Sequence, residues 1–332
     1  MADINPRGGP IQGKVMGHFF GLFHGCTQQH FQKIVASAPF DRCNLLILAF
    51  LGINQRADGA WVPVLTNGRD NCFNGGRAKA GDTDEDRIKL VMDTARAANR
   101  DVKILISFGY CNEVIKASKS PEAFANGLAA IVQKYGLDGF DIDWEQQGKL
   151  DLDGFTSCHF ATLMDHVTDA LRKVVAQPIL TICPAIVYAG SATDPLMDRT
   201  VLGKFTYVMP QTYQHGGIGT RADDYALKLG GYSNIVYGIN GEGYVNPPTW
   251  DPLQVPDDPR SSWQKAISSN AAGVFSWRLD TDSMRQATAH QCDTTCAAGE
   301  CDLEGDLQLP TYATAKAMWQ LMLGHRDGAH SE

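Results

Sequence analysis

The feature that most constrains this chain is an alternation between short apolar runs and segments whose apolar residues recur at helical spacing. Residues 45–50 form a continuous apolar run typical of a strand buried on both faces. Strands are expected over residues 15–20, 45–50, 102–108, 138–145, 179–185, 207–213, 234–238 and 273–277. Strands that alternate with helices predict a parallel sheet. Eight of them within 332 residues predict a single (β/α)8 barrel, the TIM-barrel architecture.

Length and composition favour one domain over residues 1–332, with the cysteine-rich loop and helix of residues 291–332 packed on the barrel. The net charge of −8 argues against a nucleic-acid partner. No apolar run is long enough to span a bilayer, which argues against a membrane partner. The first eight residues do not have the pattern of a signal peptide.

The predicted strand over residues 138–145 carries two contrasting faces. Successive side chains of a strand point to opposite faces, so Asp141, Asp143 and Glu145 share one face. The other face consists of Phe140, Ile142 and Trp144. Carboxylates gathered in a low-dielectric place repel one another, so at least one is expected to hold a proton near neutral pH. A protonated carboxyl beside ionised partners is suited to acid catalysis.

The spacing Asp138-x-x-Asp141-x-Asp143-x-Glu145 resembles the DxxDxDxE signature of family 18 glycoside hydrolases, the chitinase family. The resemblance implies a retaining, substrate-assisted mechanism. It implies that Glu145 is the general acid and that Asp143 orients the acetamido group of the substrate. It implies further that Asp141 pairs with Asp143, while Asp138, on the opposite face, is structural.

Other segments resemble the same family. Ser107-Phe108-Gly109-Tyr110 is similar to its SxGG motif, which implies that Ser107 binds Asp141. Tyr110 stands where the family has a second glycine, so a different loop backbone and a tyrosine in the cleft are expected there. Residues 209–213 are similar to the Q-x-Y motif, in which the tyrosine, here Tyr213, holds the substrate carbonyl. The candidate substrate-binding residues are Trp277, Gln211, Met209, Ser107, Tyr110 and Phe50.

The resemblance predicts a chitinase that hydrolyses β-1,4-linked N-acetylglucosamine polymers or oligomers without a metal or cofactor. The connection from residue 243 to 269 is too short for the small α+β domain that some family members insert, so an open groove and endo action are expected. The substrate class implies a secreted protein, and we expect a monomer. Three alternatives remain: an endo-β-N-acetylglucosaminidase acting on N-glycans, a non-catalytic chitin-binding protein, and a Mg²⁺ site formed by the three carboxylates.

Nine cysteines leave the disulfide pattern open. The cluster Cys292, Cys296 and Cys301 lies in a loop-rich stretch in which a disulfide is plausible. Pairings of Cys26 with Cys43 and of Cys72 with Cys111 are two further alternatives. Cys183 lies within an apolar strand and is predicted to be a buried free thiol.

Overall fold

The computed structural model describes residues 8–23, 28–66, 83–145, 154–185, 194–213, 220–241, 262–282 and 309–324. Its parallel strands are β1 (Val15–Gly21), β2 (Leu45–Gln55), β4 (Lys103–Gly109), β5 (Gly139–Trp144), β6 (Ile179–Pro184), β7 (Tyr207–Val208), β8 (Val236–Asn240) and β9 (Gly273–Trp277). They run in the order β7-β6-β5-β4-β2-β1-β9-β8. A parallel bridge between Val208 and Ile235 joins the two ends of this order. The predicted (β/α)8 barrel is therefore confirmed.

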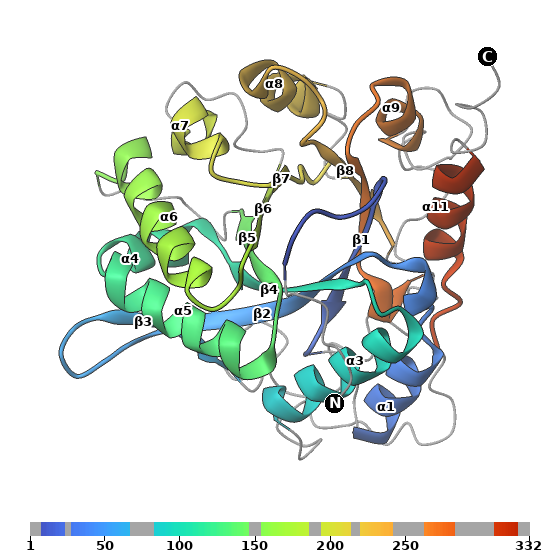
Figure 1. The fold of residues 1–332 in the computed structure, drawn as a ribbon, viewed down its shortest axis with the longest axis horizontal. Coiled ribbons are helices and arrows are strands. Elements are labelled where there is room, and N and C mark those ends of the chain that lie inside the picture. The colour runs from blue at the N-terminus through green and yellow to red at the C-terminus, as the bar shows by residue number, and fades with distance from the viewer. Residues whose placement is uncertain are drawn as a thin grey trace, which may run out of the picture.

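Helices surround the strands (Figure 1). They are α1 (Gln28–Ser37), α3 (Asp84–Ala98), α4 (Cys111–Ser118), α5 (Pro121–Tyr135), α6 (Ser157–Arg172), α7 (Arg199–Leu202), α8 (Thr220–Leu229), α9 (Ser262–Ser268) and α11 (Ala313–Gly324). Local sequence explains several of their ends. Thr83 and Asp86 form a capping box that begins α3. Pro121 begins α5, and Gly136 ends it with a φ of +66°.

Alternate residues of the strands enter two separate apolar clusters. One cluster contains Phe19, Leu105 and Phe275 together with other residues of the barrel interior. The other lies between the strands and the helices, and it includes Phe140, Ile142 and Trp144 of β5. Because β5 places these three side chains toward the helices, its carboxylates face the barrel interior.

The strand predicted over residues 45–50 is longer in the structure, and the segment after it forms a hairpin. There β2 continues to Gln55, and a strand β3 (Trp61–Leu65) pairs with it in antiparallel fashion. The turn contains Asp58-Gly59, and Gly59 has a φ of +85°, a conformation that glycine adopts without steric cost. An Asp-Gly pair between β-prone runs is a hairpin signal. Residues 67–82 lie outside the described residues.

The sixth predicted strand, over residues 207–213, is too long. Regular pairing of β7 ends at Val208, and Pro210, which has no backbone N–H, follows two residues later. The chain is held by other bonds instead: the Gln211 backbone N–H donates to the Pro184 carbonyl (2.9 Å). The Thr212 hydroxyl donates to the Gly238 carbonyl (2.7 Å).

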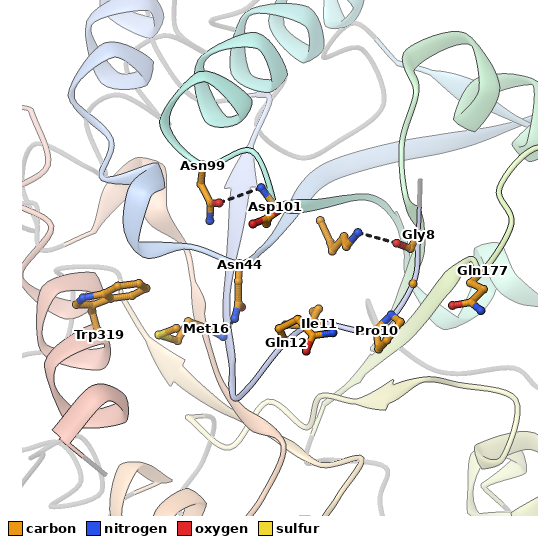
Figure 2. A pocket seen from close by; sticks show the side chains of 12 residues that line it. Gly8, Pro10, Ile11, Gln12, Met16, Asn44, Asn99, Asp101, Gln177 and Trp319 are labelled. Carbon is orange, nitrogen blue, oxygen red and sulfur yellow. Dashed lines mark hydrogen bonds between the residues drawn. The ribbon is translucent and has the colours of Figure 1, made fainter. Parts of the chain in front are cut away.

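A pocket of about 560 Å³ opens at the end of the barrel where the strands begin. Figure 2 shows that it is lined by residues from the segment before β1, from the starts of β2 and β4, and by Trp319 of α11. Its polar side chains bind the surrounding backbone: Lys103 donates to the Gly8 carbonyl (2.6 Å), and the Asn99 side chain accepts from the Asp101 N–H (3.0 Å). These contacts support the fold, as is typical of this end of such barrels.

The cysteine predictions have mixed outcomes. Cys183 is a buried free thiol, as predicted. Cys43 and Cys111 are free and buried as well, so neither alternative pairing is present. Cys43 is instead held inside the protein, where its thiol donates to the Leu45 carbonyl (3.1 Å). The cluster of Cys292, Cys296 and Cys301 lies outside the described residues.

The described part of the C-terminal segment packs on the barrel through α11. The Asp282 carboxylate accepts from the backbone N–H groups of Thr314 (3.1 Å) and Ala315 (2.8 Å) at the start of this helix. The Tyr312 hydroxyl contacts Ser37 of α1 (2.9 Å). Among the helices described, none has the length and apolar character needed to cross a membrane.

Candidate active site

Three carboxylates lie at the C-terminal end of β5. Asp141 and Asp143 are buried in the barrel interior, and Glu145 is half-buried directly after the strand. Glu145 is tied at its backbone, where its N–H donates to the Asp143 carbonyl (3.1 Å) and its carbonyl accepts from the Cys111 N–H (2.8 Å). The carboxylates thus lie at the barrel end where (β/α)8 enzymes carry their chemistry.

Asp141 is held from both neighbouring strands. The Ser107 hydroxyl on β4 donates to its Oδ2 (2.6 Å), and the Thr181 hydroxyl on β6 donates to its Oδ1 (2.5 Å). The bond from Ser107 is the contact that the family resemblance implies. Burial raises the pKa of Asp141 to about 6, and the two hydroxyl donors oppose that rise.

Asp143 lies between Asp141 and Glu145 and has a different set of partners. The Gln211 side-chain amide donates to its Oδ1 (2.8 Å), and it shares a hydrogen bond with Glu145. Burial, followed by the negative charges of Glu145 and Asp141, raises the pKa of Asp143 well above its ordinary value. This direction agrees with the expectation that one carboxyl of the cluster binds its proton more tightly than usual, and Asp143 is in direct contact with Glu145.

A row of aromatic rings forms a second part of the site. The half-buried rings of Trp277 and Phe50 stack with their centroids 5.8 Å apart and a tilt of 24°. Phe23 also stacks with Phe50, at 6.2 Å and 8°. The guanidinium of Arg278 lies 4.6 Å from the Phe23 centroid and forms a buried ion pair with Asp280 (3.3 Å). Flat apolar rings of this kind can pack against the C–H faces of a sugar.

The residues after β7 reach the same interior. Tyr213 is 8% exposed and meets Phe275 edge to face at 6.1 Å. Gln211 is 4% exposed and binds Asp143. Met209 is fully buried and packs within the interior cluster. Gln211 contacts the site through its hydrogen bond to the Asp143 carboxylate.

Tyr110 joins β4 to α4 and has an unusual backbone. Its φ is +57° and its ψ is +140°, a conformation that glycine reaches far more easily than a residue with a Cβ. The side chain is half-buried. The next residue, Cys111, donates its N–H to the Glu145 carbonyl (2.8 Å), so this strained corner supports the backbone of Glu145.

Thr181 is a site residue that the sequence interpretation missed. It is the one hydroxyl residue of β6, an otherwise apolar strand, and it pairs in register with Asp141. A hydroxyl on the interior face of a strand next to the carboxylates was the available signal.

His18 has its contacts outside this group of carboxylates. It contacts the Ser276 hydroxyl through Nδ1 (2.7 Å), and burial lowers its pKa to about 4.

Metal coordination finds no support in the described geometry. Among the residues that the structure describes, no group of three or more His, Cys, Asp or Glu side chains is arranged to hold a metal ion. Both oxygens of Asp141 already accept hydroxyl hydrogen bonds. The carboxylates therefore contact hydroxyl and amide donors and one another.

A parallel eight-stranded barrel with carboxylates at the C-terminal end of one strand defines this protein as a (β/α)8-barrel protein with an acidic site. The family model of glycosyl hydrolases family 18 matches residues 21–217, more than half of the chain. The chain belongs to this family.

Two curated relatives and one solved structure are similar to the chain. The chain is 30% identical over 152 residues to Chitinase B of Serratia marcescens, covering 41% of this chain and 28% of that protein. It is 30% identical over 135 residues to a chitinase of Enterococcus faecalis, covering 40% and 38%. A GH18 chitinase of Cycas revoluta, solved as a mutant with (GlcNAc)4, has a similar fold, with a TM-score of 0.56, 14% identity and coverage of 86% and 99%.

Proposed function

We propose that this protein is a chitinase that hydrolyses β-1,4-linked N-acetylglucosamine chains with retention of anomeric configuration. The carrying observation is the carboxylate centre, in which the buried Asp143 accepts a hydrogen bond from Gln211 and shares another with Glu145. The relatives named above are chitinases, and the similar Cycas revoluta structure contains (GlcNAc)4. Both findings support an N-acetylglucosamine oligomer as the substrate.

In the proposed first step, Glu145 gives its proton to the glycosidic oxygen and the bond from that oxygen to the anomeric carbon breaks. The carbonyl oxygen of the substrate's N-acetyl group attacks the same carbon, which gives an oxazolinium ion. Asp143 orients the acetamido group and stabilises its positive charge, and Tyr213 holds its carbonyl. Water then attacks the anomeric carbon and loses a proton to Glu145, which completes hydrolysis with retention.

The remaining parts of the proposal concern substrate placement and biology. Trp277 and Phe50 would pack against sugar rings, with Tyr110 near the cleft. We propose endo action in an open groove; residues 242–261, which contain most of the connection behind that expectation, lie outside the described residues. We also propose a single catalytic domain that is secreted and acts as a monomer.

The decisive experiment incubates the protein with N-acetylglucosamine oligosaccharides of increasing length and follows product length and anomer. The β anomer should form first, and Glu145→Gln should lower turnover by ~10²–10⁴-fold because the general acid is lost. Glu122→Gln, on the exposed start of α5, is the matched control and should leave turnover unchanged.

Each competing function gives a different result in the same assay. Cleavage of an N-glycopeptide without cleavage of chitin oligosaccharides would favour the endo-β-N-acetylglucosaminidase. Binding without any cleavage would favour a non-catalytic protein. Full turnover by Glu145→Gln would refute the assigned acid.

A further inference from the structure

We propose that Thr181 is a positioning residue that, together with Ser107, holds Asp141 as an anion and so keeps the catalytic proton on the pair formed by Asp143 and Glu145. The inference rests on the proposed function for its catalytic consequence. Its structural basis is independent of substrate, because it concerns only contacts within the barrel.

The hydrogen bonds to Asp141 favour its ionised form. Ser107 donates to one carboxylate oxygen and Thr181 to the other. A protonated carboxyl donates from one of its oxygens, so one of the hydroxyls would have to turn and accept. Hydroxyls placed at both oxygens therefore favour the ionised carboxylate, and hydrogen bonds to a charged group are among the stronger ones in proteins.

Strand register places both donors. Asp141 pairs with Ser107 of β4 on one side and with Thr181 of β6 on the other. All three are fully buried, and the β-branched threonine has few side-chain rotamers available in a strand. Its hydroxyl is thus directed at Asp141 before any substrate arrives.

The surroundings of Asp141 make these hydroxyls important. The titratable groups of the interior on β5 and on the elements beside it are Asp143, Glu145, Lys103, Cys183, Tyr207 and Tyr213. The Lys103 amine donates to the Gly8 carbonyl, and burial raises the pKa values of the Cys183 thiol and the Tyr207 hydroxyl. Asp143 and Glu145 bring negative charge. Within the described part of the chain, Asp141 accepts from the hydroxyls of Ser107 and Thr181 and from the backbone N–H of Ile142.

Ionised Asp141 in turn strengthens the hold of Asp143 on its proton, because the negative charge of Asp141 contributes to the raised pKa of Asp143. Without the Thr181 hydroxyl, Asp141 would bind a proton at a higher pH. The form with an ionised Asp141 would then be lost at the acidic end of the working range.

The test compares Thr181→Val, which keeps the shape and removes the hydroxyl, with Thr181→Ser, which keeps the hydroxyl. In Thr181→Val, the acidic limb of the kcat/KM pH profile should move upward by about one pH unit. Thr181→Ser should restore the wild-type limb. Thr94→Val is the matched control, because the half-buried Thr94 hydroxyl donates to the Leu90 carbonyl within α3; its profile should not move.

A second measurement is independent of activity. The carboxyl carbon of Asp141, assigned by its absence in Asp141→Asn, is titrated by NMR in ¹³C-aspartate-labelled protein. Its midpoint should rise in Thr181→Val and in Thr181→Ala, which covers the case that one variant does not fold. An unmoved midpoint in the folded hydroxyl-free variants overturns the inference. If the wild type does not cleave chitin oligosaccharides, the proposed function fails while this titration still decides the role of Thr181.

Discussion

Asp138 lies directly before β5 and Asp141 lies three residues later, within the strand, and the pair shows how one strand serves two purposes. Both side chains are buried, and each carboxylate accepts two hydrogen bonds from groups outside β5. The donors to Asp138 are the backbone N–H groups of Gly8 (2.7 Å) and Ile104 (2.9 Å). The donors to Asp141 are side-chain hydroxyls. The two sites differ in what their donors are able to do.

A backbone N–H can only donate, whereas a hydroxyl can turn and accept. Asp138 is therefore suited to one charge state, and Arg96 adds a cation 3.7 Å from its Oδ2. Asp141 has surroundings that can adapt to a change of proton, and its neighbours on the strand are further carboxylates. The comparison indicates that fixed donors build the fold at the start of β5, while adjustable donors serve chemistry at its end.

The largest effect should appear in turnover. Asp143→Asn removes the carboxyl group that is proposed to orient the acetamido group and stabilise the oxazolinium ion, so kcat on N-acetylglucosamine oligosaccharides should fall by ~10²–10³-fold while the protein stays folded. The same substitution at the exposed Asp165 of α6 is the control and should leave kcat unchanged. A kcat within a factor of two of the wild type would remove Asp143 from the mechanism.

Asp138→Asn should act on stability instead. Its amide can accept from only one of the two backbone donors, and its NH₂ group would face the other. Leaving a buried N–H without an acceptor should lower the free energy of unfolding by about 2–3 kcal/mol, measured as the midpoint of urea denaturation at constant slope. The kcat of the folded protein should be unaffected. A large loss of kcat with unchanged stability would break the proposed division between the two ends of β5.

Asp141→Asn should change the free energy of unfolding in the opposite direction and make the folded protein more stable. One hydroxyl can turn to accept from the new NH₂ group, so both hydrogen bonds persist. Burial raises the pKa of Asp141 from 3.8 to about 6, so the folded state binds this proton more tightly than the unfolded chain. Ionised Asp141 therefore lowers stability increasingly as pH rises from about 4 to about 6, and the full cost is present above that range.

The variant should thus be more stable than the wild type by about 2 kcal/mol near pH 7. This advantage should shrink as pH falls through about 6 toward 4 and disappear below that. Urea denaturation at a series of pH values measures it. An advantage that does not change with pH would show that the proton on Asp141 is not its cause.

Sequence reasoning reached the barrel and its acidic strand because both depend on local alternation. The period of two in residues 138–145 is readable within one strand. Thr181 could not be found in this way, since its role depends on the register between β5 and β6, which joins residues 40 positions apart in the chain. Nonlocal pairing is also why Ser107 was found only through a family resemblance.

Other differences between the predicted and the observed elements arise at single residues with special backbone properties. Pro210 marks where regular pairing of β7 has ended, although Met209 and Tyr213 still reach the interior. Gly59 turns the chain into the hairpin of β2 and β3. Helix α4 begins directly after Tyr110, whose positive φ redirects the chain.

The smallest predicted effect is a change in stability caused by the backbone conformation at Tyr110. This residue follows β4, at the end of the barrel where the carboxylates lie. Comparing Tyr110→Gly with Tyr110→Ala removes the ring in both variants and the Cβ in only one. Because φ is +57° at this position, the glycine variant should be the more stable by about 1 kcal/mol, even though glycine loses more conformational entropy on folding. Urea denaturation of the two variants measures the difference. If alanine were as stable as glycine, the backbone at residue 110 would not be strained, and the support it gives to Glu145 through Cys111 would carry no cost to the fold.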